Sequence, residues 1–339
     1  MAIYARLPRR AERRVRGGGG CLGAGSGRTE HPDPWHLSRS PVRSSSSGPT
    51  RPAALVSPIE LFGTTFQNPI LLAAGTAGFG RELDRVIDLD LLGGIVTKAV
   101  TPEPRQGHPA LRVAEFRGGM LNAVGLANPG VERVAAHELP WLSQRLQRGG
   151  PGGARIIVNV AGATVADYAL VIERLTPIQA ITAFEINASC PNTKAGGLEF
   201  GAEPGGLAEL VRACRRVSTR PLTVKLSPVL PDIPAMARVA RDEGADAVSL
   251  VNTIPGSLDR RLGNGSGGLS GPALLPIGVL ATRRVRERVD MPVIGVGGVR
   301  TVADAREYLA AGASLVAIGT AALADPRVPV RIARELNHG

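Results

Sequence analysis

The chain is poor in aromatic residues and in cysteine, and it has no long hydrophobic run. Phe, Trp and Tyr make up 3% of its 339 residues. No apolar stretch approaches the roughly 18 residues that a membrane-spanning helix needs, so we expect no membrane span. The three cysteines, Cys21, Cys190 and Cys214, are odd in number and far apart, which argues against a disulfide framework and against a metal site. These absences predict a cytoplasmic protein.

The net charge of +11 is concentrated at the N-terminus. Residues 1–50 hold nine Arg against Glu12, Glu30 and Asp33, a net +6, which leaves +5 for the other 289 residues. Nucleic-acid binding would need basic residues on one face together with aromatic side chains that stack on bases. We therefore expect no nucleic-acid partner.

Lysine is also scarce, because only Lys98, Lys194 and Lys225 occur among the 40 basic residues. A guanidinium cannot replace a compact ammonium on a thin, flexible stem where a small point charge is needed. Lys98 and Lys225 lie at the ends of predicted strands and are candidates for chemistry. Lys194 lies in a loop, where a solvated side chain is an equally good interpretation.

Residues 1–53 are rich in Arg, Gly, Ser and Pro and show no sustained hydrophobic period. Such a composition cannot bury enough apolar surface to offset the entropy of ordering, so we predict a disordered tail. The composition is typical of an organelle transit peptide, and a start codon assigned too far upstream would look the same. Residues 54–339 are predicted to form one folded domain.

Short apolar runs alternate with amphipathic stretches from residue 59 onward. A short hairpin is expected at 59–66, followed by eight buried strands. Short, continuous apolar strands separated by helices indicate a parallel sheet whose outer face is covered. Eight such units favour a (β/α)8 TIM barrel over a doubly wound open sheet, and no Gly-x-Gly-x-x-Gly turn follows the first strand. The expected strands are 70–74, 95–98, 156–160, 184–187, 222–226, 247–252, 293–296 and 315–319.

Polar residues end five of these strands. Active sites of such barrels lie at the C-terminal ends of the strands. An amide side chain offers both a hydrogen-bond donor and an acceptor, which suits a planar ring with alternating polar groups. The sequence thus predicts a polar mouth on an apolar barrel. The residues concerned are Lys98, Asn159, Asn187, Lys225 and Asn252.

The last two strands are followed by glycine-rich turns. Gly297 and Gly298 precede a helix after the seventh strand, and Gly319 with Thr320 follows the eighth. Glycine lets backbone N–H groups approach an anion, and the loops after strands seven and eight are a recurrent phosphate site in barrels. We therefore expect a phosphate-bearing ligand.

Four segments together resemble the dihydroorotate dehydrogenases. They are 118–130 (GGMLNAVGLANPG), 187–192 (NASCPN), 224–228 (VKLSP) and 295–299 (GVGGV). The resemblance runs from about residue 59 to residue 336. It implies an FMN-carrying barrel that oxidises dihydroorotate to orotate in pyrimidine biosynthesis.

The resemblance also implies roles for individual residues. FMN would be contacted by Ala74, Lys98, Ala99, Asn159, Asn187, Lys225, Val251, Gly271, Gly297, Gly298, Gly319 and Thr320. The substrate would be held by Lys98, Asn122, Ala123, Val124, Gly125, Leu126, Asn187, Asn252 and Thr253. Family members usually carry Ser where this chain has Ala74; if that contact runs through a hydroxyl, FMN binds somewhat more weakly here.

Cys190 would act as the base at C5 of the substrate while the C6 hydride passes to FMN, and Lys225 would stabilise negative charge on the reduced flavin. Members of the family that use Cys are the soluble ones. The segment 190–201 (CPNTKAGGLEFG) is similar to the NAD-linked branch. In that branch the catalytic subunit pairs with a subunit that carries FAD and a 2Fe–2S cluster, and the family favours homodimers.

Three other functions remain open on the sequence alone. A related FMN barrel acting on uracil or thymine, as in dihydropyrimidine dehydrogenases, would share the Cys base and the amide-rich pocket. A non-redox phosphate barrel such as an aldolase or isomerase would be colourless. A nucleic-acid-binding module would depend on the basic tail.

Overall fold

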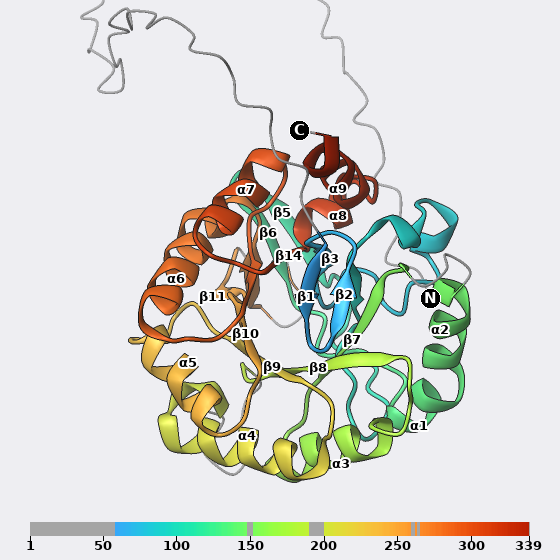
Figure 1. The fold of residues 1–339 in the computed structure, drawn as a ribbon, viewed down its shortest axis with the longest axis vertical. Coiled ribbons are helices and arrows are strands. Elements are labelled where there is room, and N and C mark those ends of the chain that lie inside the picture. The colour runs from blue at the N-terminus through green and yellow to red at the C-terminus, as the bar shows by residue number, and fades with distance from the viewer. Residues whose placement is uncertain (1–57, 148–151, 190–199, 259–261, 263–264, 339) are drawn as a thin grey trace, which may run out of the picture. The chain divides into compact units, whose positions relative to one another are not determined.

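The computed structural model describes residues 58–147, 152–189, 200–258, 262 and 265–338. The predicted tail, residues 1–53, lies outside the described residues. Eight parallel strands form a closed barrel in which each strand pairs with the next barrel strand along the chain, and the last pairs with the first. The predicted TIM barrel is confirmed (Figure 1). Its strands are β3 (Ile70–Leu72), β4 (Gly94–Val96), β7 (Arg155–Val160), β8 (Ile181–Asn187), β9 (Leu222–Leu226), β10 (Ala247–Leu250), β13 (Val293–Val296) and β14 (Leu315–Ile318).

The predicted N-terminal hairpin is also confirmed. Strands β1 (Ile59–Leu61) and β2 (Thr64–Phe66) pair antiparallel, and Figure 1 shows them across the centre of the barrel. Phe66 is fully buried and packs in one cluster with Leu71 and Ile157, whose side chains point into the barrel. Because β2 leads directly into β3, the hairpin closes the N-terminal end of the barrel. Any ligand must therefore enter from the opposite end, where the strands terminate.

Helices surround the barrel (Figure 1). Several of them begin where the sequence provides a cap: Thr164 and Thr301 each form a capping box with an Asp three residues later. Asp232 caps the first turn of a helix that carries proline in that turn. The helices are α1 (Val131–Arg133), α2 (Leu139–Gln147), α3 (Val165–Leu175), α4 (Pro204–Val217), α5 (Ile233–Asp242), α6 (Leu275–Arg288), α7 (Val302–Ala310), α8 (Thr320–Ala324) and α9 (Val328–His338).

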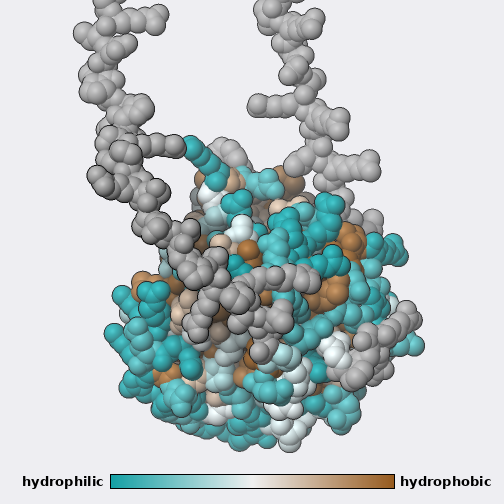
Figure 2. All heavy atoms as spheres, turned by 45° about the horizontal axis from the view of Figure 1, so that its top comes forward, coloured by the Kyte–Doolittle hydropathy of each residue, from teal (hydrophilic) through white to brown (hydrophobic). Residues whose placement is uncertain are grey.

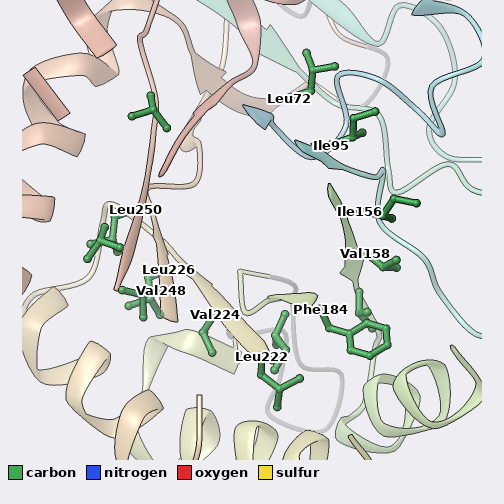
Figure 3. Packing of buried hydrophobic residues seen from close by; sticks show 14 of the residues in the cluster. Leu72, Ile95, Ile156, Val158, Phe184, Leu222, Val224, Leu226, Val248 and Leu250 are labelled. Atoms are coloured by element: carbon green, nitrogen blue, oxygen red, sulfur yellow. The ribbon is translucent and has the colours of Figure 1, made fainter. Parts of the chain in front are cut away.

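The core between strands and helices is formed by every second strand residue. Figure 3 shows Ile156, Phe184 and Val224 on the outer side of the barrel, toward the helices. All three belong to one buried cluster that also contains helix residues such as Tyr168 and Leu210. Since neighbouring strand residues point to opposite faces, the residues between them point into the barrel.

One element is absent from the sequence-based prediction. Strands β5 (Val113–Phe116), β6 (Gly119–Asn122), β11 (Ile254–Gly256) and β12 (Gly267–Ser270) form an antiparallel sheet in the order β11-β12-β6-β5. The first two follow β4 and the last two follow β10. Because both insertions leave the C-terminal ends of barrel strands, their sheet lies at the open end of the barrel.

The outer surface carries mostly polar side chains. Figure 2 shows a largely hydrophilic face on which hydrophobic residues are scattered. In the part of the chain that the structure describes, no helix has the length and apolarity required to cross a membrane.

Candidate functional site

The barrel interior has two chemically different halves. We define the apolar half by the buried inward residues on and directly after β13, β14, β3 and β4, and the polar half by the buried polar residues of β7 to β10. Each set lies on neighbouring strands, although β7 and β8 also carry the inward apolar residues Ile157 and Ala183. The apolar half consists of Leu71, Ala73, Val96, Ile294, Val296, Leu315 and Ala317, and the polar half of Asn159, Glu185, Thr223, Lys225 and Ser249.

Glu185 is the centre of the polar half. Asn159 Nδ2 donates to its Oε1 at 2.7 Å, and Ser249 Oγ donates to its Oε2 at 2.6 Å. Strands β8 and β10 are separated by β9, so the bond between Glu185 and Ser249 crosses the barrel interior. Glu185 is missing from the sequence-based site. The alternation of the strand gives a signal for it, because a carboxylate two residues before the inward Asn187 must also point inward.

Lys225 is placed beside this carboxylate. Its Nζ lies 4.0 Å from Glu185 Oε1, and only 9% of its side chain is exposed. That separation is longer than a hydrogen bond, and the described residues provide no hydrogen-bond acceptor for the ammonium. Three donors therefore remain for a ligand that brings an electron-rich atom to the mouth.

Two predicted amides meet at the ends of β8 and β10. Asn252 Nδ2 donates to Asn187 Oδ1 at 3.1 Å, and Asn252 Oδ1 accepts from the backbone N–H of Thr253 at 2.9 Å. The backbone of Asn187 is fixed from outside, since Tyr168 donates to its carbonyl at 2.8 Å. The two strand ends thus hold a pre-oriented amide pair, with one Asn187 N–H₂ group left for a ring acceptor.

Lys98 follows β4 and is half-buried. Burial lowers the pKa of its ammonium; nearby Glu82 opposes this effect and Arg112 adds to it. No carboxylate of the described residues lies within 4 Å of it. A partly desolvated ammonium without a counter-ion favours an anionic ligand.

The glycine turns occupy the ends of adjacent strands, as predicted. Gly297 and Gly298 have φ values of +121° and +78°, a region that favours glycine. Tyr308 donates to the carbonyl of Gly297 at 2.9 Å, which fixes this turn. Beyond β14, Thr320 Oγ1 donates to Ser270 Oγ at 2.9 Å. The turn after β14 is therefore tied to the antiparallel sheet at the open end.

The antiparallel sheet positions the segment predicted to hold the substrate. Asn122 ends β6, and its Nδ2 donates to the carbonyl of Gly268 in β12 at 3.1 Å. The chain then turns through Gly125 and Leu126, with φ values of +70° and +56°. A Cβ at Gly125 would lie 2.6 Å from the backbone nitrogen of His108, so this close approach requires glycine.

Of the remaining predicted residues, Ala74 and Ala99 are half-buried next to β3 and β4. Val251 is buried, and its N–H donates to Val296 across the barrel edge. Gly271, with φ +107°, lies against Gly119, where a Cβ would come within 2.8 Å of the Gly119 Cα. Ala123 and Val124 lie in the turn that follows β6.

The predicted base, Cys190, lies outside the described residues, and so does Lys194. Ser189, which precedes Cys190, is described, and its buried Oγ has no hydrogen-bond partner among the described residues. Cys214 is a free, buried thiol on α4, as the sequence predicts, and burial raises its pKa to about 12. Cys214 therefore stays protonated at neutral pH and cannot serve as a base.

A cavity lies at the opposite end of the barrel, away from the predicted site. This cavity of about 780 Å³ is lined by Phe62, Arg155 and Arg220 among others. Arg155 donates to the carbonyl of Thr65, and Arg220 donates to those of Thr176 and Ile181. Its lining contains none of the predicted site residues and no carboxylate. The polar half and the mouth above it remain the candidate active site.

Known proteins similar to this chain agree with one another. The family profile described as dihydroorotate dehydrogenase matches residues 57–339. A protein of Geobacillus kaustophilus named "Dihydroorotate dehydrogenase B (NAD(+)), catalytic subunit" is 46% identical over 284 residues, which are 82% of this chain and 88% of that protein. A protein of the same name from Listeria monocytogenes is 46% identical over 284 residues, 82% of this chain and 91% of the relative.

Proposed function

Because the chain belongs to the dihydroorotate dehydrogenase family, we propose that it is a catalytic subunit that oxidises dihydroorotate to orotate in pyrimidine biosynthesis. The observation that carries the proposal is the arrangement of the polar half. A nearly buried Lys225 with unused donors is the register partner of Asn187, which is hydrogen-bonded to Asn252. Such a surface suits a planar ring system with polar edges stacked on a second ring.

The residues fit a bound FMN. Adjacent strands β13 and β14 end in turns whose glycines leave the backbone accessible to a phosphate. Lys225 offers an ammonium to the electron-rich edge of a flavin. The residues proposed to hold FMN are Ala74, Lys98, Ala99, Asn159, Asn187, Lys225, Val251, Gly271, Gly297, Gly298, Gly319 and Thr320. Val251 is buried, so we assign its contact to the backbone.

The substrate carries a carboxylate and a flat amide-containing ring. Lys98 has an ammonium with a lowered pKa and no carboxylate partner among the described residues, and it would bind the substrate carboxylate. Asn187, Asn252 and Thr253 would hold the ring through their polar groups, and positioning of this kind is worth several kcal/mol in favourable cases, up to about 7–11 kcal/mol. The turn from Asn122 through Ala123, Val124 and Gly125 to Leu126 would close over the substrate from the antiparallel sheet.

In the proposed reaction, Cys190 removes a proton from C5 of dihydroorotate. Bound FMN would supply the acceptor for the hydride that leaves C6. Lys225 would hold a positive charge where negative charge accumulates during the reaction. The amide pair of Asn187 and Asn252 would hold the ring in place during the reaction.

The names of the relatives support further parts of the proposal. They are called catalytic subunits and NAD(+) enzymes. We propose that electrons leave this chain through a partner subunit carrying FAD and a 2Fe–2S cluster and reach NAD+. A homodimer, a cytoplasmic location and a catalytic domain spanning residues 54–339 are further predictions from the sequence.

The experiment is anaerobic addition of dihydroorotate to the purified, FMN-loaded chain. We expect prompt bleaching of the flavin absorbance, and loss of bleaching near neutral pH in Cys190→Ser. A flavoprotein bleached by dihydrouracil or dihydrothymine and not by dihydroorotate would assign the chain to the other dihydropyrimidines. A chain that cannot be loaded with FMN would overturn the redox function.

A further inference from the structure

A buried carboxylate below the proposed flavin site has no part in the reaction described above. Glu185 is 1% exposed, and both of its oxygens are engaged, Oε1 by Asn159 and Oε2 by Ser249. A carboxylate transferred from water to such a place is costly unless it is hydrogen-bonded and paired with a cation. Among the described residues, Lys225 is the cation within 4.0 Å of it.

The geometry of this pair differs from that of an ordinary salt bridge. At 4.0 Å, Lys225 Nζ is close enough for strong Coulomb attraction in a dry interior, yet too far for a hydrogen bond. The hydrogen bonds that Glu185 accepts come from two neutral side chains, Asn159 and Ser249. The carboxylate therefore balances the ammonium charge of Lys225 without using its N–H donors, which stay available to a ligand.

The positions of the four side chains follow from the strand register. Asn159 is the register partner of Glu185 in β7–β8, and Lys225 is the register partner of Ser249 in β9–β10. Each of four consecutive strands thus contributes one polar side chain to a single cluster. Glu185 interacts with the other three, so its replacement would remove a hydrogen-bond partner from Asn159 and Ser249 and the opposite charge from Lys225.

We propose that Glu185 is a positioning residue of the active site: its carboxylate orients Asn159 and Ser249 through hydrogen bonds, balances the charge of Lys225 and so sets the charge beneath the flavin. The flavin part of this inference rests on the proposed function. With Glu185 in place, the positive charge of Lys225 is partly balanced. Without it, the site gains one net positive charge, which favours the anionic reduced flavin.

Glu185→Gln isolates the charge from the shape. A glutamine oxygen can still accept from Asn159, and its amide group can donate to the Ser249 hydroxyl, which is also an acceptor. The matched control is Glu173→Gln on α3, an exposed position that removes the same charge from the outer surface. Glu185→Asp keeps the charge and shortens the side chain.

The first measurement is the two-electron potential of the bound FMN, taken for all variants at one pH. We expect Glu185→Gln to shift the reduction equilibrium toward the reduced flavin by at least about tenfold, which corresponds to about 30 mV for two electrons. Glu173→Gln and Glu185→Asp should stay close to the natural chain. An unchanged potential in Glu185→Gln, or an equal shift in Glu185→Asp, would overturn the electrostatic role.

The second measurement needs neither flavin nor substrate. Melting temperatures of the FMN-free chain are compared for Glu185→Gln, Lys225→Met and the double variant. We expect each single change to lower the melting temperature. The fall in the double variant should be much smaller than the sum of the two single falls, because the double variant has no unpaired buried charge. Strictly additive losses would contradict the coupling. A coupled cycle in a chain that fails to bind FMN would contradict the proposed function alone.

Discussion

The two halves of the barrel interior share one backbone geometry and carry opposite side-chain chemistry. In the apolar half, residues such as Leu71 and Ile294 pack on each other and on Phe66 of the hairpin. In the polar half, Glu185 joins three polar side chains from neighbouring strands. The comparison indicates that the apolar half stabilises the barrel. The polar half contributes less to stability and instead holds charged and polar groups in a fixed arrangement.

The largest expected effect comes from the chemistry at the end of the polar half. Cys190→Ala removes the proposed base, which follows the strand carrying Glu185 and Asn187. Proton transfer by a positioned side chain contributes roughly 100- to 10,000-fold, and we expect flavin reduction by dihydroorotate to slow by about that factor. Anaerobic stopped-flow absorbance measures it, with FMN content as the control. A variant that keeps the natural rate would require another base.

A change in the apolar half should do the reverse. Leu71→Ala empties part of a fully buried site, and such truncations cost about 2–5 kcal/mol of unfolding free energy. The rate of flavin reduction per bound FMN should stay within about twofold, because Leu71 packs in an apolar cluster and its register partners are Ala317 and Gly94. Urea unfolding and stopped-flow reduction test the two parts. A large loss of rate at unchanged stability would abolish the distinction between the halves.

Within the polar half, we expect the hydrogen bonds to Glu185 to contribute more to the free energy of unfolding than the longer contacts nearby. Ser249→Ala leaves Oε2 of Glu185 without its 2.6 Å donor, and the loss of a partner for a buried group costs about 1–3 kcal/mol. Thr223→Val is the matched control, since among the described residues the Thr223 hydroxyl has one hydrogen-bond partner, Ser249, at 3.4 Å. Urea unfolding of both variants gives the comparison. Equal losses of unfolding free energy in the two variants would mean that the hydrogen bond from Ser249 to Glu185 contributes no more to stability than the longer contact does.

The smallest effect concerns pH at the mouth. Burial lowers the pKa of Lys98, so its ammonium loses the proton at a lower pH than an ordinary lysine does. Orotate affinity should therefore fall as pH rises through this lowered pKa, by about tenfold if one charge-assisted hydrogen bond is lost. Lys98→Arg stays charged and should remove the alkaline decline, even if it binds more weakly throughout. Flavin absorbance titrations with orotate across the alkaline range measure both, and parallel curves would exclude Lys98 as the titrating group.

Much of this site could be predicted from the sequence because its signals are local. The hairpin and all eight barrel strands lie where short apolar runs predict them. Lys225, Asn159 and Asn187 were identified from their positions at strand ends. Each of these features depends on a few neighbouring residues.

The antiparallel sheet and Glu185 escaped prediction for a different reason. Strand β6 pairs with β12, almost 150 residues further along the chain, and neither strand has a pattern that names its partner. Glu185 stands among apolar residues, and its alternation with Asn187 indicates its direction without indicating what it meets. The hydrophobic period of a short segment shows how that segment folds, but it does not show which distant segment pairs with it.

The sequence by itself determined the barrel, the end at which the site lies and the residue types available there. Hydrophobic period and turn chemistry specify these features, because they act over a few residues. The tertiary structure alone decided that Asn159, Lys225 and Ser249 converge on one buried carboxylate, and that the barrel is apolar on its other side. Closing the barrel brings side chains from four strands close together in a buried place, where their charges act more strongly on one another than they would in water.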